Sequence, residues 1–129
     1  MMRYLLDTTA LIDYSKGREP AQTRILALIE TGEEVGVCAV NVAEFYAGLA
    51  PSTHQVWDQF IESLSYWHIG REAAARAGQE RYELARRGQT ISLADALVGA
   101  AAREYDATLI TSNVRDYPMP DLRLLSIRN

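Results

Sequence analysis

The fold is decided by the stretch RYLLDTTALID, residues 3–13, in which an apolar run ends at one charged residue and a helical pattern follows. Arg3 to Leu6 is typical of a short buried strand, and Thr9 to Ser15 of a helix that stops near Gly17. Asp7 stands between them, just past the carboxyl end of the strand. The same alternation of strand and helix continues along the rest of the chain.

Further strands are expected at residues 35–40, 66–69, 108–111 and 122–127, and further helices at residues 20–32, 42–50, 56–64, 71–87 and 92–105. This order predicts an α/β fold, a three-layer α/β/α sandwich with a mainly parallel sheet and residues 122–127 at one edge. Ligands of such folds bind outside the carboxyl ends of the strands, where Asp7 and Asn113 both lie.

Size and composition favour a single soluble domain spanning residues 1–129, because 48% of the residues are hydrophobic and 23% are charged. Cys38 is the only cysteine, which excludes an intrachain disulfide and favours a small buried side chain in a reducing compartment. We find neither a signal peptide nor an apolar run long enough to cross a membrane, so we expect a cytoplasmic protein without membrane contact.

The net charge of −4 argues against nucleic-acid binding, because contacts to phosphates normally supply much of the affinity. Every basic residue except Lys16 is an arginine, and arginine suits bidentate phosphate contacts but equally suits surface ion pairs. The arginines of residues 71–87 form no single stripe and indicate a solvated helix.

Three carboxylates stand alone in apolar surroundings. Asp7 is the only charged residue of residues 4–12, Glu44 of residues 35–51 and Asp95 of residues 90–102. Buried, unpaired carboxylates are costly, and a shared divalent cation would offset both their desolvation and their mutual repulsion. Mg²⁺ and Mn²⁺ favour such oxygen ligands.

Structural roles for the same acids remain open. Asp95 follows Ser92 in a capping-box pattern, Asp7 can cap the next helix, and Glu44 can pair with a distant arginine. Capping and metal ligation are also compatible, since a capping carboxylate keeps oxygens that face outward.

Four segments resemble the PIN domain family: YLLDTTALID at residues 4–13, NVAEFYAGL at 41–49, SLADALVGAAA at 92–102 and TLITSNVRDY at 108–117. The resemblance spans essentially the whole chain and is closest to the VapC ribonuclease toxins of toxin–antitoxin pairs. It implies a Rossmann-like fold and an endoribonuclease that depends on Mg²⁺, with Mn²⁺ able to substitute. It also implies RNA as the substrate, a homodimer and a VapB-type antitoxin as partner.

Carried over residue by residue, the resemblance makes Asp7, Glu44 and Asp95 metal ligands and catalytic residues. The fourth acidic position of many members falls on Asn113, which can still support the site by offering a neutral oxygen to water or metal. Asp116, three residues later, can supply the missing charge as a further catalytic acid. Thr9, Thr111 and Ser112 are expected in supporting roles, positioning waters of the metal. The implied reaction is hydrolysis of an RNA phosphodiester by a metal-activated water, so no side chain serves as the nucleophile.

Other functions fit the sequence less well. A phosphotransferase of the haloacid dehalogenase type needs a second aspartate where Thr9 stands, and a receiver domain needs a lysine after a late strand. A hydrolase that pairs Cys38 with His54 or His68 has no support beyond the presence of those residues. A non-toxin PIN protein that processes or binds RNA through a weakened metal site remains an alternative, because of Asn113.

Overall fold

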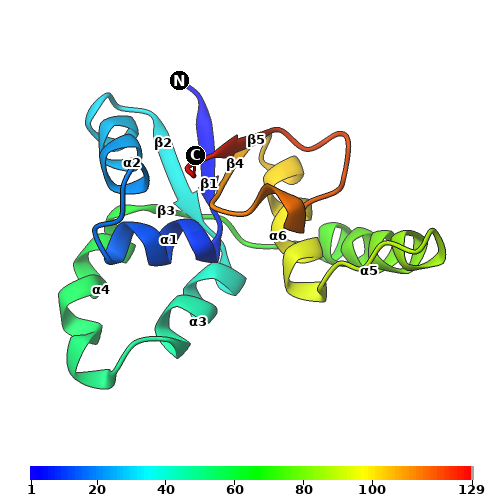
Figure 1. Ribbon diagram of the computed structural model, residues 1–129, viewed down its shortest axis with the longest axis horizontal. Coiled ribbons are helices and arrows are strands. Elements are labelled where there is room, and N and C mark those ends of the chain that lie inside the picture. The colour runs from blue at the N-terminus through cyan, green and yellow to red at the C-terminus, as the bar shows by residue number, and fades with distance from the viewer. Residues whose placement is uncertain (129) are drawn as a thin grey trace.

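Five parallel strands form the centre of the protein in a computed structural model that describes residues 1–128 (Figure 1). Their order across the sheet is β3-β2-β1-β4-β5. The strands are β1 (Arg3–Leu6), β2 (Glu34–Val37), β3 (Ser65–Tyr66), β4 (Thr108–Thr111) and β5 (Leu124–Ser126). All four pairings are parallel, and β5 lies at an edge, as the sequence predicts.

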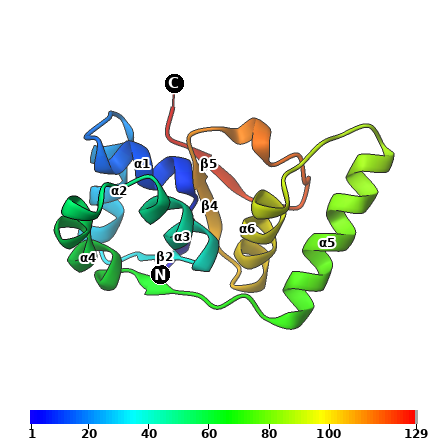
Figure 2. The ribbon, with the colours of Figure 1, turned by 90° about the horizontal axis from the view of Figure 1, so that it is seen from below.

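Helices cover both faces of this sheet. They are α1 (Thr8–Ser15), α2 (Ala21–Glu30), α3 (Ala39–Ala47), α4 (His54–Ser63), α5 (Arg71–Arg86) and α6 (Leu93–Glu104), with short 3₁₀ turns η1 (Pro51–Thr53) and η2 (Val114–Asp116). Figure 2 shows α1 and α2 on one side of the strands and α6 on the other, with α5 outside α6. The predicted three-layer sandwich is therefore confirmed. None of the helices in residues 1–128 has the length and apolar character needed to cross a membrane.

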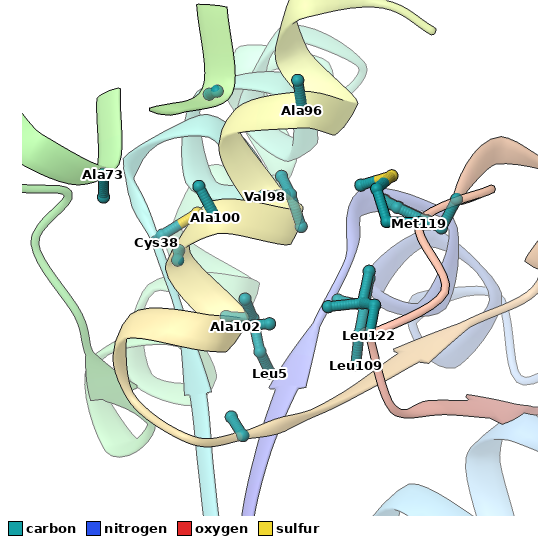
Figure 3. Close-up of a cluster of buried hydrophobic side chains, with 14 of the residues drawn as sticks. Leu5, Cys38, Ala73, Ala96, Val98, Ala100, Ala102, Leu109, Met119 and Leu122 are labelled. Atoms are coloured by element: carbon teal, nitrogen blue, oxygen red, sulfur yellow. The ribbon is translucent and has the colours of Figure 1, made fainter. Parts of the chain in front are cut away.

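Successive strand residues point to opposite faces of the sheet, and this alternation builds two cores. Leu5 and Leu109 pack with α6, whereas their neighbours Leu6 and Ile110 pack with α1 and α2. The side of α6 that faces the sheet is rich in small residues, which let the helix lie close to the strands (Figure 3). The residues of α6 labelled in this view, Ala96, Val98, Ala100 and Ala102, are buried on different sides of the helix. The strand ends, and with them Asp7, are held between two packed layers.

Several predicted boundaries were wrong, most clearly at the second strand. It ends at Val37 rather than at residue 40, and α3 begins at Ala39 rather than at residue 42. Asn41 explains the early turn, because its Oδ1 accepts hydrogen bonds from the backbone N–H and the thiol of Cys38, both at 3.1 Å. This side-chain cap starts the helix inside a run of apolar residues that otherwise reads as strand. The third strand is also shorter than predicted, spanning only Ser65–Tyr66.

Gly36 marks the closest approach of β2 to a neighbouring aromatic ring. A Cβ at this position would lie 2.9 Å from two ring carbons of Trp67, which is itself buried and stacked on Tyr105. We expect Gly36→Ala to lower the free energy of unfolding by about 1–3 kcal/mol, since the ring cannot move without disturbing its own packing.

Chemical denaturation measures this effect, with Gly78→Ala as the matched control. Gly78 lies in α5 with no atom within 4 Å of an added Cβ. That substitution should stabilise the protein by up to about 1 kcal/mol, because alanine is the better helix former. Equal effects at the two glycines would contradict the packing argument.

Candidate active site

The candidate site lies at the carboxyl ends of the neighbouring strands β1 and β4, at the topological switch point of the sheet. From β1 the chain proceeds outward through β2 and β3 on one side, and β4 and β5 lie on the other. Asp7 follows β1 directly, and its backbone N–H donates to the carbonyl of Ile110 in β4 at 3.0 Å. The carboxyl ends of the strands at such a switch point are the usual ligand site of open parallel sheets.

Asp7 is buried, with 2% of its surface exposed, and caps α1. Its Oδ1 accepts hydrogen bonds from the backbone N–H of Ala10 at 2.8 Å and from the Thr9 hydroxyl at 2.7 Å. Its Oδ2 accepts a hydrogen bond from the Tyr117 hydroxyl at 3.0 Å. Burial raises the pKa of Asp7, and these hydrogen bonds offset that rise only in part. A carboxylate offers about four acceptor positions, so one position on Oδ2 remains.

Asp95 lies in the first turn of α6, half-buried beside Asp7. The capping residue of that helix is Ser92, whose hydroxyl accepts from the Asp95 backbone N–H at 3.0 Å. Burial raises the pKa of Asp95, and repulsion from Asp116, Asp7 and Glu44 raises it further. The Asp95 carboxylate therefore lies within electrostatic reach of three other acids.

Glu44 reaches the site from α3, but the predicted burial was wrong for it: the residue is exposed. Its only side-chain hydrogen bond within residues 1–128 comes from the Thr8 hydroxyl, at 2.6 Å to Oε1. Thr8 follows Asp7, so this bond ties α3 to the start of α1. Of its two neighbours in the sequence, Phe45 packs into the core, whereas Ala43 is exposed like Glu44 itself.

Asn113 and Asp116 form one unit rather than two alternatives. The Asn113 Nδ2 donates to Asp116 Oδ1 at 3.0 Å across the 3₁₀ turn η2. Asp116 is close enough to Asp95 to raise its pKa, which places a fourth carboxylate at the site. A carboxylate three residues after position 113 therefore lies near Asp95.

Three hydrogen-bonding residues hold the backbone around Asp7 in position: Thr9, Thr111 and Ser112. The Thr9 hydroxyl donates to Asp7, accepts from the Ser112 backbone N–H at 3.0 Å and lies 3.4 Å from the Thr111 hydroxyl. The Thr111 oxygen in turn accepts from the Asn113 backbone N–H at 2.9 Å. These contacts join the segment after β4 to the segment after β1, so a shift of either would move Asp7.

Tyr117 is a site residue that the sequence reading missed. It is 4% exposed, and its hydroxyl lies 3.0 Å from Asp7 Oδ2 and 3.4 Å from Asp95 Oδ1. Burial, followed by the negative charges of Asp7 and Asp95, raises the pKa of Tyr117, so the phenol keeps its proton and acts as a donor between two acids. The only sequence signal was the position of this tyrosine next to Asp116.

Removing that hydroxyl should cost stability in a pH-dependent manner. We expect Tyr117→Phe to lower the free energy of unfolding by about 1–3 kcal/mol at pH 7, where the bond is made to a charged carboxylate. The Tyr117 bond lowers the pKa of Asp7, so its loss raises that pKa further. The penalty should therefore shrink as the pH falls and Asp7 becomes protonated.

Denaturation of metal-free protein at pH 7 and pH 4 measures this difference, with Tyr105→Phe as the control. The Tyr105 hydroxyl donates to the backbone carbonyl of His68 at 2.7 Å, so its loss should cost the same at both pH values. If Tyr117→Phe lowers the free energy of unfolding equally at the two pH values, the strength of the Tyr117 bond does not depend on the charge of Asp7.

Asp13 is a second buried acid that the sequence reading did not single out. It lies on α1 and is 3% exposed. Burial acts to raise its pKa, but hydrogen bonds from Ser112, Arg18 and Arg128 outweigh burial and leave the pKa lowered. Asp13 is therefore a stable carboxylate that fixes Ser112, the residue between Thr111 and Asn113.

The donor set suits a hard divalent cation. Four carboxylates and the Asn113 amide lie in this part of the molecule, and the repulsion of Asp95 by Asp116, Asp7 and Glu44 is the feature that a cation offsets. In their present positions, no three Asp, Glu, His or Cys side chains of residues 1–128 are close enough together to hold one ion. The Thr8 and Tyr117 hydroxyls engage Glu44 and Asp7 instead.

Cys38 does not fit the alternative of a cysteine hydrolase. Its thiol donates to Asn41 at 3.1 Å, and burial raises its pKa. A nucleophilic cysteine requires the opposite shift, toward the thiolate.

Comparisons with known proteins agree with this geometry. The model of the PIN domain family matches residues 4–117. Ribonuclease VapC19 of Mycobacterium tuberculosis is 35% identical over 123 residues, which cover 92% of this chain and 96% of that protein. The tRNA(fMet)-specific endonuclease VapC of Shigella flexneri is 26% identical over 91% of each chain.

Solved structures show the same fold. VapBC2 from Rickettsia felis, bound to a DNA fragment from their promoter, superposes with a TM-score of 0.82 at 23% identity over 97% of this chain and 98% of that one. DNA-bound VapBC from Salmonella typhimurium gives a TM-score of 0.81 at 24% identity over 98% of each chain. With the family model matched over residues 4–117, the chain belongs to the PIN domain family.

Proposed function

We propose that this chain is an endoribonuclease of the VapC type, which depends on Mg²⁺ or Mn²⁺ and acts as the toxin of a toxin–antitoxin pair. The similarity to ribonucleases VapC supports the reaction class. The observation that carries the proposal is the position of Asp7: a buried carboxylate with a raised pKa, at the carboxyl end of β1, beside Asp95, whose pKa is raised in part by Asp116, Asp7 and Glu44.

Asp7, Glu44 and Asp95 would hold the cation, with Asp116 as a further catalytic acid and Asn113 as its partner. A bound cation would polarise the phosphodiester, stabilise the leaving oxygen and lower the pKa of the attacking water. The protein itself supplies the positioning. Thr9 and Ala10 fix one oxygen of Asp7, so that only its Oδ2 faces the substrate.

Asp95 lies on the opposite side of the site from Asp7. It is fixed at the first turn of α6 by Ser92 and faces Asp7 across the Tyr117 hydroxyl. Within residues 1–128 His54 and His68 take no part in this arrangement: His54 contacts the Leu49 carbonyl at 3.3 Å, and His68 binds Tyr105 through its backbone. Proton transfer is therefore left to the carboxylates and water.

Cleavage of single-stranded RNA by the purified protein tests the proposal. We expect Asp95→Asn to lower the cleavage rate by about 10³-fold or more, because it removes a ligand charge and several kcal/mol of transition-state stabilisation. EDTA should abolish wild-type cleavage, and added Mg²⁺ or Mn²⁺ should restore it. Asp106→Asn is the control, since Asp106 is exposed and paired with Arg123. Cleavage that survives both EDTA and Asp95→Asn would refute the metal site.

The partners follow from the same similarity. Solved relatives include a toxin–antitoxin complex from Klebsiella pneumoniae and a member of the VapBC family of toxin–antitoxin systems from Mycobacterium tuberculosis, so we propose a VapB-type antitoxin for this chain. A homodimeric toxin is proposed from the resemblance to the PIN domain family alone. Induced expression should arrest growth in the wild type but not in Asp95→Asn, and co-expression of the antitoxin should relieve the arrest. Equal arrest by both forms would show that RNA cleavage is not its cause.

A further inference from the structure

A pair of arginines is held beside the candidate site by the buried carboxylate of Asp13. Arg18 Nη1 donates to Asp13 Oδ1 at 2.9 Å. Arg128 approaches from beyond β5, with its Nε 3.3 Å from Oδ2 and its Nη2 3.4 Å from Oδ1. The Ser112 hydroxyl also donates to Oδ2. The acceptor positions of Asp13 are therefore filled, and both guanidinium groups are fixed in place.

Most of the donors on these two arginines face outward. Each guanidinium carries five N–H groups, of which Asp13 receives one from Arg18 and two from Arg128. Within residues 1–128 neither guanidinium has another protein acceptor, and the two side chains are 51% and 58% exposed. They border an open hollow whose other lining residues are Asp13, Glu19 and Pro20.

The formal charges of the hollow cancel, because Arg18 and Arg128 balance Asp13 and Glu19, so an anion would be held by the unused N–H groups of the arginines. Asp13 is a single charge shared by two cations. Glu19 is fully exposed and already accepts hydrogen bonds from the backbone N–H of Thr23 at 2.9 Å and from the Thr23 hydroxyl. In a chain with a net charge of −4, two fixed guanidinium groups next to an acidic site are suited to attract a phosphate.

Ser112 links this hollow to the site. Its hydroxyl binds Asp13, while its backbone N–H binds the Thr9 oxygen that also contacts Asp7. Along α1, Asp7 and Asp13 are separated by six residues, which corresponds to roughly 9 Å of helix. A phosphate in the hollow would therefore be one that neighbours the cleaved bond rather than the cleaved phosphate itself.

We propose that Arg18 and Arg128 form a binding subsite for an RNA backbone phosphate that flanks the cleaved bond, with Asp13 as the residue that positions them. This inference rests on the proposed ribonuclease function. It assigns the phosphate contact to a fixed pair of arginines from opposite ends of the chain, and it accounts for a buried, charged Asp13 beside the site.

Binding of a labelled single-stranded RNA oligonucleotide, in EDTA to prevent cleavage, tests the subsite over a series of salt concentrations. For the double variant Arg18→Ala/Arg128→Ala we expect about tenfold weaker binding at low salt. The slope of log K against log salt should fall by about 0.7 for each phosphate that the variant no longer binds. In cleavage assays KM should rise while kcat stays close to the wild-type value. A dinucleotide substrate has no flanking phosphate, so the double variant and the wild type should cleave it with the same kcat and KM.

The matched control is Arg3→Ala/Arg123→Ala. These arginines are 49% and 54% exposed and are also ion-paired, but they lie at the other ends of the strands, with Glu34 and Asp106. The control should leave the salt slope unchanged. Loss of both arginines also leaves the buried Asp13 carboxylate without a cationic partner. Arg18→Lys and Arg128→Lys therefore serve as variants that keep the positive charge. Each lysine variant should retain the wild-type salt slope but bind RNA more weakly, because a lysine cannot make bidentate contacts.

A salt slope that is the same for the wild type and the double alanine variant, both folded, would overturn the subsite. So would an equal rise in KM for the dinucleotide and the longer RNA. The proposed function fails separately, if the wild type neither binds nor cleaves RNA at any salt concentration. A purely structural role for the arginines predicts lower melting temperatures with an unchanged salt slope, which counts against the subsite.

Discussion

Asp7→Asn should abolish RNA cleavage and, at the same time, make the metal-free protein more stable. The amide keeps the shape of the carboxylate, so its oxygen can still accept from Ala10 and Thr9 as the cap of α1. The loss of charge removes the central metal ligand, for which we expect a fall in rate of about 10³-fold or more. The gain in stability comes from the cost of keeping that charge buried.

The sign of the stability change follows from the raised pKa of Asp7. An acid whose pKa is higher in the folded state binds protons more readily when folded than when unfolded. Stability therefore falls as the pH rises from the unfolded pKa, near 4, through the folded pKa, and the full penalty is present above it. At pH 7 the neutral amide of Asp7→Asn carries no such penalty, so the melting temperature of the metal-free variant should exceed that of the wild type.

Thermal melts in EDTA at pH 7 measure this gain, and Asp106→Asn serves as the control because Asp106 is 85% exposed. The difference between the wild type and Asp7→Asn should narrow toward pH 4, where Asp7 takes up a proton. If Asp7→Asn is less stable than the wild type at pH 7, the charged Asp7 carboxylate stabilises the metal-free fold, and its burial carries no net electrostatic cost.

The second large effect is expected far from the site, at the ion pair that joins α5 to α6. Glu80 accepts from Arg103 Nη2 at 2.6 Å and Nη1 at 3.1 Å, and their side chains are only 20% and 9% exposed. Glu80→Gln leaves a buried guanidinium with Asp121, 3.1 Å away, as its remaining carboxylate. We expect the free energy of unfolding to fall by about 2–4 kcal/mol, because removal of one partner of a buried ion pair is costly and the remaining partner, Asp121, is 52% exposed.

Denaturant unfolding tests this expectation, with Glu72→Gln on the same helix as the control, since Glu72 is exposed. Adding Arg103→Met to Glu80→Gln should restore part of the lost stability, because it removes the stranded charge. If Glu80→Gln costs no more than about 0.5 kcal/mol, the pair is no stronger than a surface salt bridge.

The layers of the fold could be predicted from the sequence because they depend on local patterns. The strand and helix periods place Leu5 and Leu6 on opposite faces, and Asp7 follows as the first polar residue past the strand. The start of α3 could not be predicted in the same way. It depends on one side-chain cap at Asn41, which lies within a run of strand-like residues.

The site was predictable only in part, for a related reason. Isolation in an apolar sequence identified Asp7 and Asp95, but it predicted the wrong exposure for Glu44, whose outward direction depends on the rotation of α3. Tyr117 and Asp13 could not be predicted because their partners are far away in the sequence. Tyr117 and Asp7 are 110 residues apart, and Asp13 and Arg128 are 115 residues apart. Long-range pairs of this kind leave no periodic signal in one sequence.

The central claim is that Asp7 and its neighbouring acids together form one functional cation site. Titration of the purified protein with Mn²⁺, followed by electron paramagnetic resonance, tests this most directly. We predict Mn²⁺ binding by the wild type and by Asp106→Asn, competition by Mg²⁺, and loss of that binding in Asp7→Asn. Mn²⁺ binding by Asp7→Asn that equals the wild type would contradict the claim.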